Sequence, residues 1–86
     1  MNIFYSKPFI DKVNQLPIEA KRVLKKKLEL LMENPRHPSL RTRKIQGQAG
    51  IFEASITMDI RITWQYTEDG ILLRNIEEHD KTLKTP

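Results

Sequence analysis

The sequence contains no cysteine, only three glycines and one tryptophan among 86 residues. The absence of cysteine excludes disulfide bonds and thiolate metal sites, and a reducing cytoplasm is the compartment that fits such a chain. No apolar run approaches the ~20 residues that a membrane span needs, and residues 1–30 lack the apolar stretch of a signal peptide. We therefore expect one cytoplasmic domain over residues 1–86, with no membrane contact.

Positive charge is concentrated in the first part of the chain. Residues 1–50 hold 11 Lys and Arg against 4 Asp and Glu, whereas residues 51–86 hold 4 against 7. The two parts carry +7 and −3, which gives the net charge of +4. This distribution predicts a surface that attracts polyanions. Nucleic acid and an acidic protein partner both fit, and the charge alone does not choose between them.

Periodicity predicts a short N-terminal strand and then two helices. The stretch "NIFYS" at residues 2–6 is typical of a strand, and Ser6 is a good residue to begin a helix. Phe9 and Leu16 lie seven positions apart on one face of that helix, which Pro17 ends. A second helix is expected over residues 17–33. Because the connection is so short, the two should form an antiparallel helical hairpin.

The last third of the chain has the alternation of a sheet. Strands are expected over residues 51–56, 60–66 and 71–76, with a further short strand within 42–46. Trp64 and Tyr66 fall on the apolar face and are expected in the core. This element order predicts an α+β fold: an N-terminal strand and an antiparallel helical hairpin packed on a mostly antiparallel sheet.

The register of the two long strands has a consequence for function. A three-residue turn at 57–59 pairs Ser55 with Arg61 and Glu53 with Thr63, because a slip of one residue would turn Arg61 into the core. Glu53 and Arg61 then share the other face as diagonal neighbours, roughly 7–8 Å apart. A carboxylate and a guanidinium beside a basic segment can handle an anion. They can equally form a simple cross-strand ion pair worth at most about 1 kcal/mol.

The basic segment lies at residues 36–44. It contains no acidic residue, and its basic side chains are Arg36, His37, Arg41, Arg43 and Lys44. This lack of compensating acid favours anion binding over a merely solvated loop, although His37 can also serve only the turn. Two histidines without ligand spacing do not predict a metal site.

Four segments together resemble the RelE/ParE superfamily of bacterial toxins. They are "FYSKPF" (4–9), "LLMENPRHPSLRTRKIQG" (30–47), "GIFEASITMDIRITWQY" (50–66) and "ILLRNIEEHD" (71–80). The resemblance covers nearly the whole chain and is fairly specific for the RelE-like branch, whose members include RelE, YoeB and YafQ. It implies a microbial-ribonuclease-like fold and cleavage of mRNA in the ribosomal A site without metal or other cofactor. It also implies an antitoxin partner.

The resemblance assigns roles to particular residues. Glu53 matches the strand glutamate that acts as base in YoeB-like members, and Arg61 matches the arginine that binds the scissile phosphate. His79 matches the histidine that follows the last strand. We expect Glu53 and His79 to divide the base and acid roles, with Glu53 the leading base, although the order can be reversed. The residues expected to hold the RNA are His37, Arg41, Arg43 and Lys44.

Two other functions stay open. ParE-type relatives share the fold but poison DNA gyrase, and a gyrase poison has no need of the set Glu53, Arg61 and His79. A third reading is a degenerate homologue that binds its antitoxin but no longer cuts RNA. It is favoured by "DKTL" at residues 80–83, which stands where the tails of the family usually carry an aromatic residue.

Overall fold

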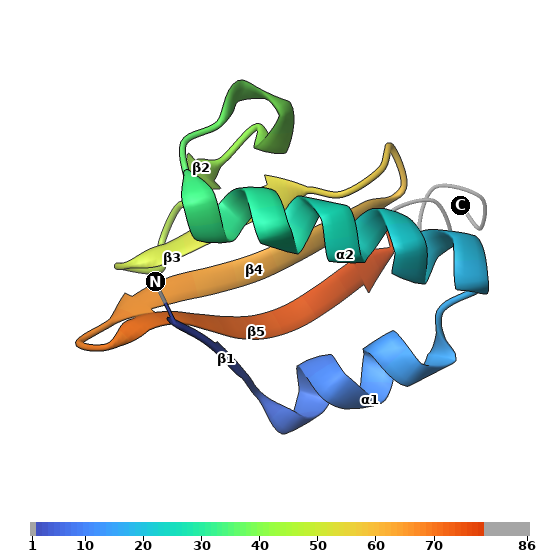
Figure 1. Ribbon diagram of the computed structural model, residues 1–86. Helices are drawn as coiled ribbons and strands as arrows, with labels where there is room; N and C mark the ends of the chain where they lie inside the picture. The colour runs from blue at the N-terminus through green and yellow to red at the C-terminus, as the bar shows by residue number, and fades with distance from the viewer. Residues whose placement is uncertain (1, 79–86) are drawn as a thin grey trace.

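The computed structural model describes residues 2–78, which form two helices and a five-stranded sheet (Figure 1). The elements are β1 (Asn2–Tyr5), α1 (Lys7–Gln15), α2 (Ile18–Glu33), the 3-10 helix η1 (Pro38–Leu40), β2 (Arg43–Lys44), β3 (Ile51–Ser55), β4 (Ile60–Thr67) and β5 (Gly70–Glu78). The strand order is β1-β5-β4-β3-β2, and only the β1–β5 pair is parallel. The predicted α+β fold is confirmed. Neither helix in the described part of the chain is long and apolar enough to cross a membrane.

Ser6 joins the start of α1 to the sheet. Its hydroxyl oxygen accepts a hydrogen bond from the Phe9 N–H at 3.2 Å, which satisfies one of the unpaired donors of the first helical turn. The same hydroxyl donates to the Arg74 carbonyl at 2.6 Å. At the far end of α1, the Lys12 ammonium donates to the Ile76 carbonyl at 3.0 Å. Both ends of α1 are therefore fixed to β5.

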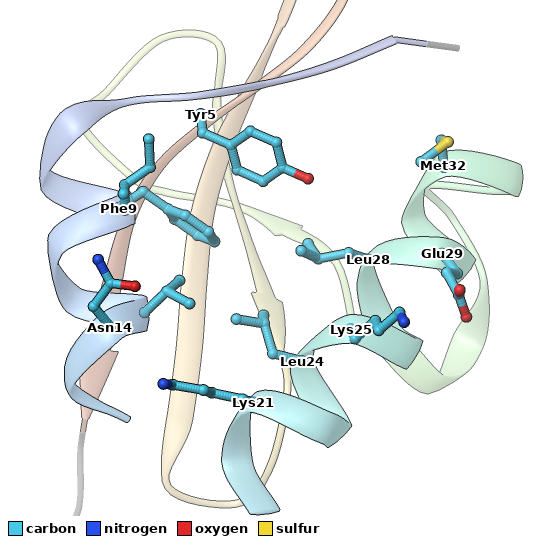
Figure 2. A pocket seen from close by; sticks show the side chains of 11 residues that line it. Tyr5, Phe9, Asn14, Lys21, Leu24, Lys25, Leu28, Glu29 and Met32 are labelled. Carbon is cyan, nitrogen blue, oxygen red and sulfur yellow. The ribbon is translucent and has the colours of Figure 1, made fainter. Parts of the chain in front are cut away.

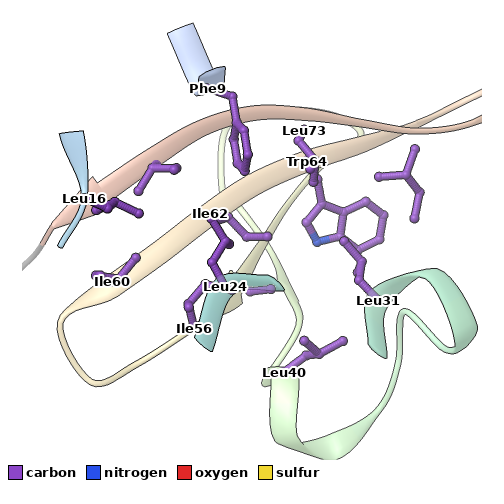
Figure 3. Packing of buried hydrophobic residues seen from close by; sticks show 13 residues of the cluster. Phe9, Leu16, Leu24, Leu31, Leu40, Ile56, Ile60, Ile62, Trp64 and Leu73 are labelled. Atoms are coloured by element: carbon purple, nitrogen blue, oxygen red, sulfur yellow. The ribbon is translucent and has the colours of Figure 1, made fainter. Parts of the chain in front are cut away.

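One core lies between the helices and the sheet (Figure 3). The side chains that enter it from the helical layer are Phe9 of α1, Leu16 at the C-cap of α1, Leu24 and Leu31 of α2, and Leu40 of η1. They meet strand residues that include Ile62, Trp64 and Leu73, each at most 1% exposed. The helical face predicted from Phe9 and Leu16 therefore packs on the sheet. Burial of the apolar surface of both helices is the main source of stability.

The aromatic residues of β4 behave differently from each other. Trp64 is 1% exposed and stacks on Phe52 with ring centroids 4.7 Å apart. Tyr66 is 48% exposed and places its edge against Phe52 and Trp64. The prediction of a core position was correct for Trp64 and wrong for Tyr66, because Tyr66 lies near the end of β4, where burial decreases.

A bulge in the β4–β5 pair adjusts which residues of β5 reach the core. Thr63 pairs with Asn75 and Trp64 pairs with Leu73, which leaves Arg74 as the extra residue. Leu73 and Ile76 are an odd number of positions apart, yet both are buried. Without the bulge, strict alternation would turn one of them to the opposite face.

Candidate active site around Glu53 and Arg61

Three neighbouring strands bring charged side chains together on the face opposite the helices. Arg43 of β2 pairs with Glu53 of β3, and Glu53 pairs with Thr63 of β4. Ser55 pairs with Arg61, which confirms the register predicted from the sequence. Alternation along the strands then places Arg43, Glu53 and Arg61 on one face, because the residues adjacent to Glu53 and Arg61 enter the core.

Glu53 is the centre of an Arg–Glu–Arg cluster. Arg43 donates to Glu53 Oε1 through Nε at 3.0 Å and Nη2 at 2.9 Å, and Arg61 Nε lies 3.8 Å from the same oxygen. The Glu53 side chain is 11% exposed, against 25% for Arg61 and 72% for Arg43. Within residues 2–78, the second oxygen, Oε2, makes no hydrogen bond. Glu53 thus keeps one oxygen free to accept a proton.

The turn between β3 and β4 fixes the guanidinium of Arg61. Arg61 Nη1 donates to the carbonyls of Thr57 and Met58, at 3.3 and 3.2 Å. The turn is itself closed by the Thr57 hydroxyl oxygen, which accepts from the N–H groups of Asp59 and Ile60 at 3.1 Å each. With Nε facing Glu53, the orientation of the group is set before any ligand binds. Arg61 Nη2 makes no hydrogen bond in the described part of the chain.

The basic segment contributes to the site unevenly. Arg43, Lys44 and Glu53 line one hollow of about 390 Å³. Arg41 lines a separate hollow, which it shares with Arg61. His37 has a structural task, since its Nδ1 accepts from the Ser39 N–H at 3.1 Å and caps η1. The structure therefore groups three of the four expected RNA-binding residues, Arg41, Arg43 and Lys44, around Glu53 and Arg61. It uses one ring nitrogen of His37 in the loop.

His79, the third member of the expected catalytic set, lies outside the described residues. Among residues 2–78, no three His, Asp or Glu side chains come together in a way that could hold a metal ion.

Sequence reasoning missed the strongest contact of the site. Arg43 was expected to face RNA, whereas its guanidinium is bound to Glu53. The signal is weak because β2 has only two residues and follows an irregular loop, so its register does not show in the sequence. Ser55 was also overlooked, although the predicted register places it directly opposite Arg61.

Comparison with known proteins gives a consistent picture of the fold. No family model and no curated protein matches the sequence. Solved structures do match over nearly their full length. The YafQ toxin in the Escherichia coli DinJ–YafQ complex is 19% identical with a TM-score of 0.76, and 93% of each chain is covered.

Two further structures support the same conclusion. RelE in the archaeal RelE–RelB complex of Pyrococcus horikoshii is 14% identical, with a TM-score of 0.74 and coverage of 91% of this chain and 93% of RelE. The YoeB/ParE toxin of Agrobacterium tumefaciens is 13% identical, with a TM-score of 0.79 and coverage of 92% and 99%. Two helices on a mostly antiparallel five-stranded sheet, matched over this length, give the chain the fold of the RelE, YafQ and YoeB toxins, as the sequence resemblance predicted.

Proposed function

We propose that this chain is the toxin of a toxin–antitoxin pair and that it cleaves mRNA on the ribosome. The observation that carries the proposal is the placement of Glu53 and Arg61. A carboxylate with one free oxygen lies 3.8 Å from a guanidinium that the turn holds in place. This pair occurs in a fold shared with the RelE, YafQ and YoeB toxins. A carboxylate and a fixed cation are two of the three groups that RNA cleavage without a metal requires.

The chemistry follows from the free atoms of these two residues. Glu53 Oε2 takes the proton of a ribose 2′-OH, and the 2′-oxygen forms a bond to the neighbouring phosphorus. Arg61 Nη2 faces the non-bridging oxygens, whose negative charge grows in the transition state. The bond from phosphorus to the 5′-oxygen breaks, and an acid protonates that oxygen. The products are a 2′,3′-cyclic phosphate and a 5′-hydroxyl.

His79 is proposed as that acid, on the basis of the sequence resemblance. A positioned acid or base typically contributes 10²–10⁴-fold to a rate. The roles of Glu53 and His79 are exchangeable in principle. Whichever group starts deprotonated acts as the base, and whichever starts protonated acts as the acid. Arg41, Arg43 and Lys44, which line the two hollows beside this pair, are proposed to bind the RNA together with His37 of the same basic segment.

The test is cleavage of mRNA on programmed ribosomes, with the new 5′ ends mapped by primer extension. We expect Arg61→Ala to reduce cleavage by at least ~100-fold, because a preorganised charge is lost. Arg22→Ala is the matched control. It also removes a guanidinium paired with a carboxylate, at 3.4 Å from Glu19, but on the exposed surface of α2. If Arg61→Ala cleaved mRNA as well as Arg22→Ala, the assignment of the active site to Glu53 and Arg61 would be refuted.

The same experiment separates the other readings. Gyrase-dependent DNA breaks with intact mRNA would favour a ParE-type poison. No cleavage and no growth arrest on expression would favour a degenerate homologue that only binds its antitoxin.

The antitoxin partner has a candidate docking surface between the helices. A groove of about 440 Å³ runs between α1 and α2, and its apolar residues include the half-exposed Tyr5, Ile10 and Met32 (Figure 2). Lys21 extends from α2 toward α1, and Lys25 lines the same groove. An amphipathic helix with an apolar stripe and acidic edges fits this combination.

The partner proposal rests on neighbours solved as complexes, RelE with RelB and YafQ with DinJ. We expect Ile10→Asp to abolish co-purification with the product of the adjacent gene. Ile18→Asp is the control, since Ile18 is 71% exposed and lies outside the groove. Equal loss of the partner from both variants would refute this docking surface.

A further inference from the structure

A second hollow borders the candidate active site on the side away from Arg43. It has a volume of about 290 Å³ and is lined by Ser39, Arg41, Ser55, Arg61 and the turn residues 56–58. Two of these residues are arginines and none carries a carboxylate. The hollow around Arg43, by contrast, contains Glu53. Among residues 2–78, charge therefore divides the site into one part with a candidate base and one part whose charged residues are all cationic.

The backbone that carries Arg41 is held firmly. Leu40 is fully buried, and the preceding turn is capped by His37 through the Ser39 N–H. The Lys27 ammonium donates to the Ser39 carbonyl at 3.2 Å and joins this turn to α2. Arg41 itself has φ +49°, a left-handed conformation that is unfavourable for any residue with a side chain. Such strain persists only where the surrounding contacts impose it.

Several donors in this hollow have no acceptor within the described part of the chain. Within residues 2–78, the Arg41 guanidinium makes no ion pair or hydrogen bond, and the Ser55 hydroxyl makes none either. Ser55 lies opposite Arg61, whose Nη2 is also free in the described residues. Two guanidinium groups near each other repel unless an anion lies between them. An oxyanion with several acceptor oxygens satisfies all three donors.

We propose that this hollow binds a second phosphate of single-stranded RNA, next to the phosphate that Arg61 holds for cleavage. The inference rests on the proposed function for the identity of its ligand. Arg41 and Ser55 are the residues that recognise this second phosphate, and Arg61 borders both positions. The strand would be held by two consecutive phosphates, with the ribose between them presented to Glu53. Arg41 and Ser55 are binding residues and take no part in proton transfer.

The test measures binding without cleavage. A fluorescein-labelled 2′-O-methyl RNA of about ten nucleotides has no 2′-OH and cannot be cut, so its anisotropy reports affinity alone. We expect Arg41→Gln to weaken binding by about tenfold, because a charge-assisted hydrogen bond is lost. The slope of log K against log salt should fall by about 0.7, the value for one phosphate contact on a single strand. Ser55→Ala should weaken binding by a few fold and leave the slope unchanged.

Arg36→Gln is the matched control. Arg36 belongs to the same basic segment and is exposed, but it does not line the hollow. Equal effects of Arg36→Gln and Arg41→Gln would overturn the second phosphate position, as would the absence of measurable binding by the unchanged protein at low salt. The proposal would also be overturned if Arg41→Gln weakened the binding of a polyglutamate peptide more than the binding of RNA.

The binding assay and the cleavage assay together distinguish failure of the second phosphate position from failure of the nuclease proposal. If the unchanged protein cleaves mRNA on the ribosome but Arg36→Gln and Arg41→Gln bind RNA equally well, the second phosphate position is refuted and the nuclease proposal stands. Selective loss of RNA binding in Arg41→Gln, together with no cleavage by the unchanged protein, would support the position and refute the nuclease.

Discussion

Gly70 pairs with Asn2 at the start of the parallel β1–β5 ladder, and replacing it should test this pairing directly. A Cβ atom at Gly70 would lie 2.1 Å from the carbonyl oxygen of Asn2 and 2.8 Å from its carbonyl carbon. A Cβ atom essentially never lies within 3.0 Å of such an atom, so the two backbones would have to separate by about 1 Å. Gly70 also has φ +156°, which residues with a side chain rarely adopt.

The expected loss for Gly70→Ala follows from these two effects. Backbone strain of this kind costs about 1–3 kcal/mol, and a lost ladder hydrogen bond costs about 0.5–1.5 kcal/mol. We therefore expect the free energy of unfolding to fall by about 2–4 kcal/mol. In a domain of this size each kcal/mol lowers Tm by about 4–8 °C, so the decrease should be roughly 10–30 °C.

Gly47→Ala provides the comparison that isolates the clash. Gly47 has φ +81°, but a Cβ there would meet nothing within 4 Å, so only the conformational cost of about 1–2 kcal/mol remains. Urea unfolding can be followed by the fluorescence of Trp64, the single tryptophan, which is 1% exposed. If Gly70→Ala lost no more stability than Gly47→Ala, the close approach of β1 to β5 would be refuted.

Three further predictions concern the cap, the ion cluster and the core. Ser6→Ala should cost about 1–2 kcal/mol in urea unfolding, since it removes both the cap of α1 and a bond to β5; a loss below ~0.3 kcal/mol would contradict this. Arg43→Ala should cost at most about 1 kcal/mol because its side chain is 72% exposed. Glu53→Ala should cost about 2 kcal/mol, since the largely buried guanidinium of Arg61 loses its counter-charge. Equal losses of stability in Arg43→Ala and Glu53→Ala would contradict this geometry. Trp64→Phe should cost at most about 2 kcal/mol, because it removes a buried Nε1 that has no acceptor within residues 2–78. Leu31→Ala should cost about 2–5 kcal/mol, since it leaves a cavity in the core. Thermal melts of the two variants show whether Leu31→Ala is the less stable, as expected.

The sheet could be predicted in detail where the pattern of side chains imposes one solution. Ile60, Ile62 and Trp64 alternate with polar residues, and a slip by one would bury Arg61. The three-residue turn at 57–59 leaves a single pairing that keeps both apolar faces together. For that reason the neighbourhood of Glu53 and Arg61 was visible in the sequence.

The rest of the site depends on contacts that no local pattern encodes. Arg43 reaches Glu53 only because a loop of irregular conformation returns the chain to the edge of the sheet. The left-handed conformation of Arg41 is imposed by the buried Leu40 and the cap from His37, and arginine has no preference for it. His79 and its role stay predictions from the sequence.

The parallel pairing of β1 with β5 also determines when the sheet can close during synthesis. Ser6 bonds to the carbonyl of a residue 68 positions later, and β1 pairs with the start of β5. During synthesis β1 leaves the ribosome first and has no partner until β5 emerges, so the sheet closes only after residues 70–78 have been made. The β3–β4–β5 meander, on which Glu53 and Arg61 lie, also forms late. A chain that has not yet reached β5 therefore lacks the strand that joins β1 to β4, and the sheet that carries Glu53 and Arg61 is still incomplete.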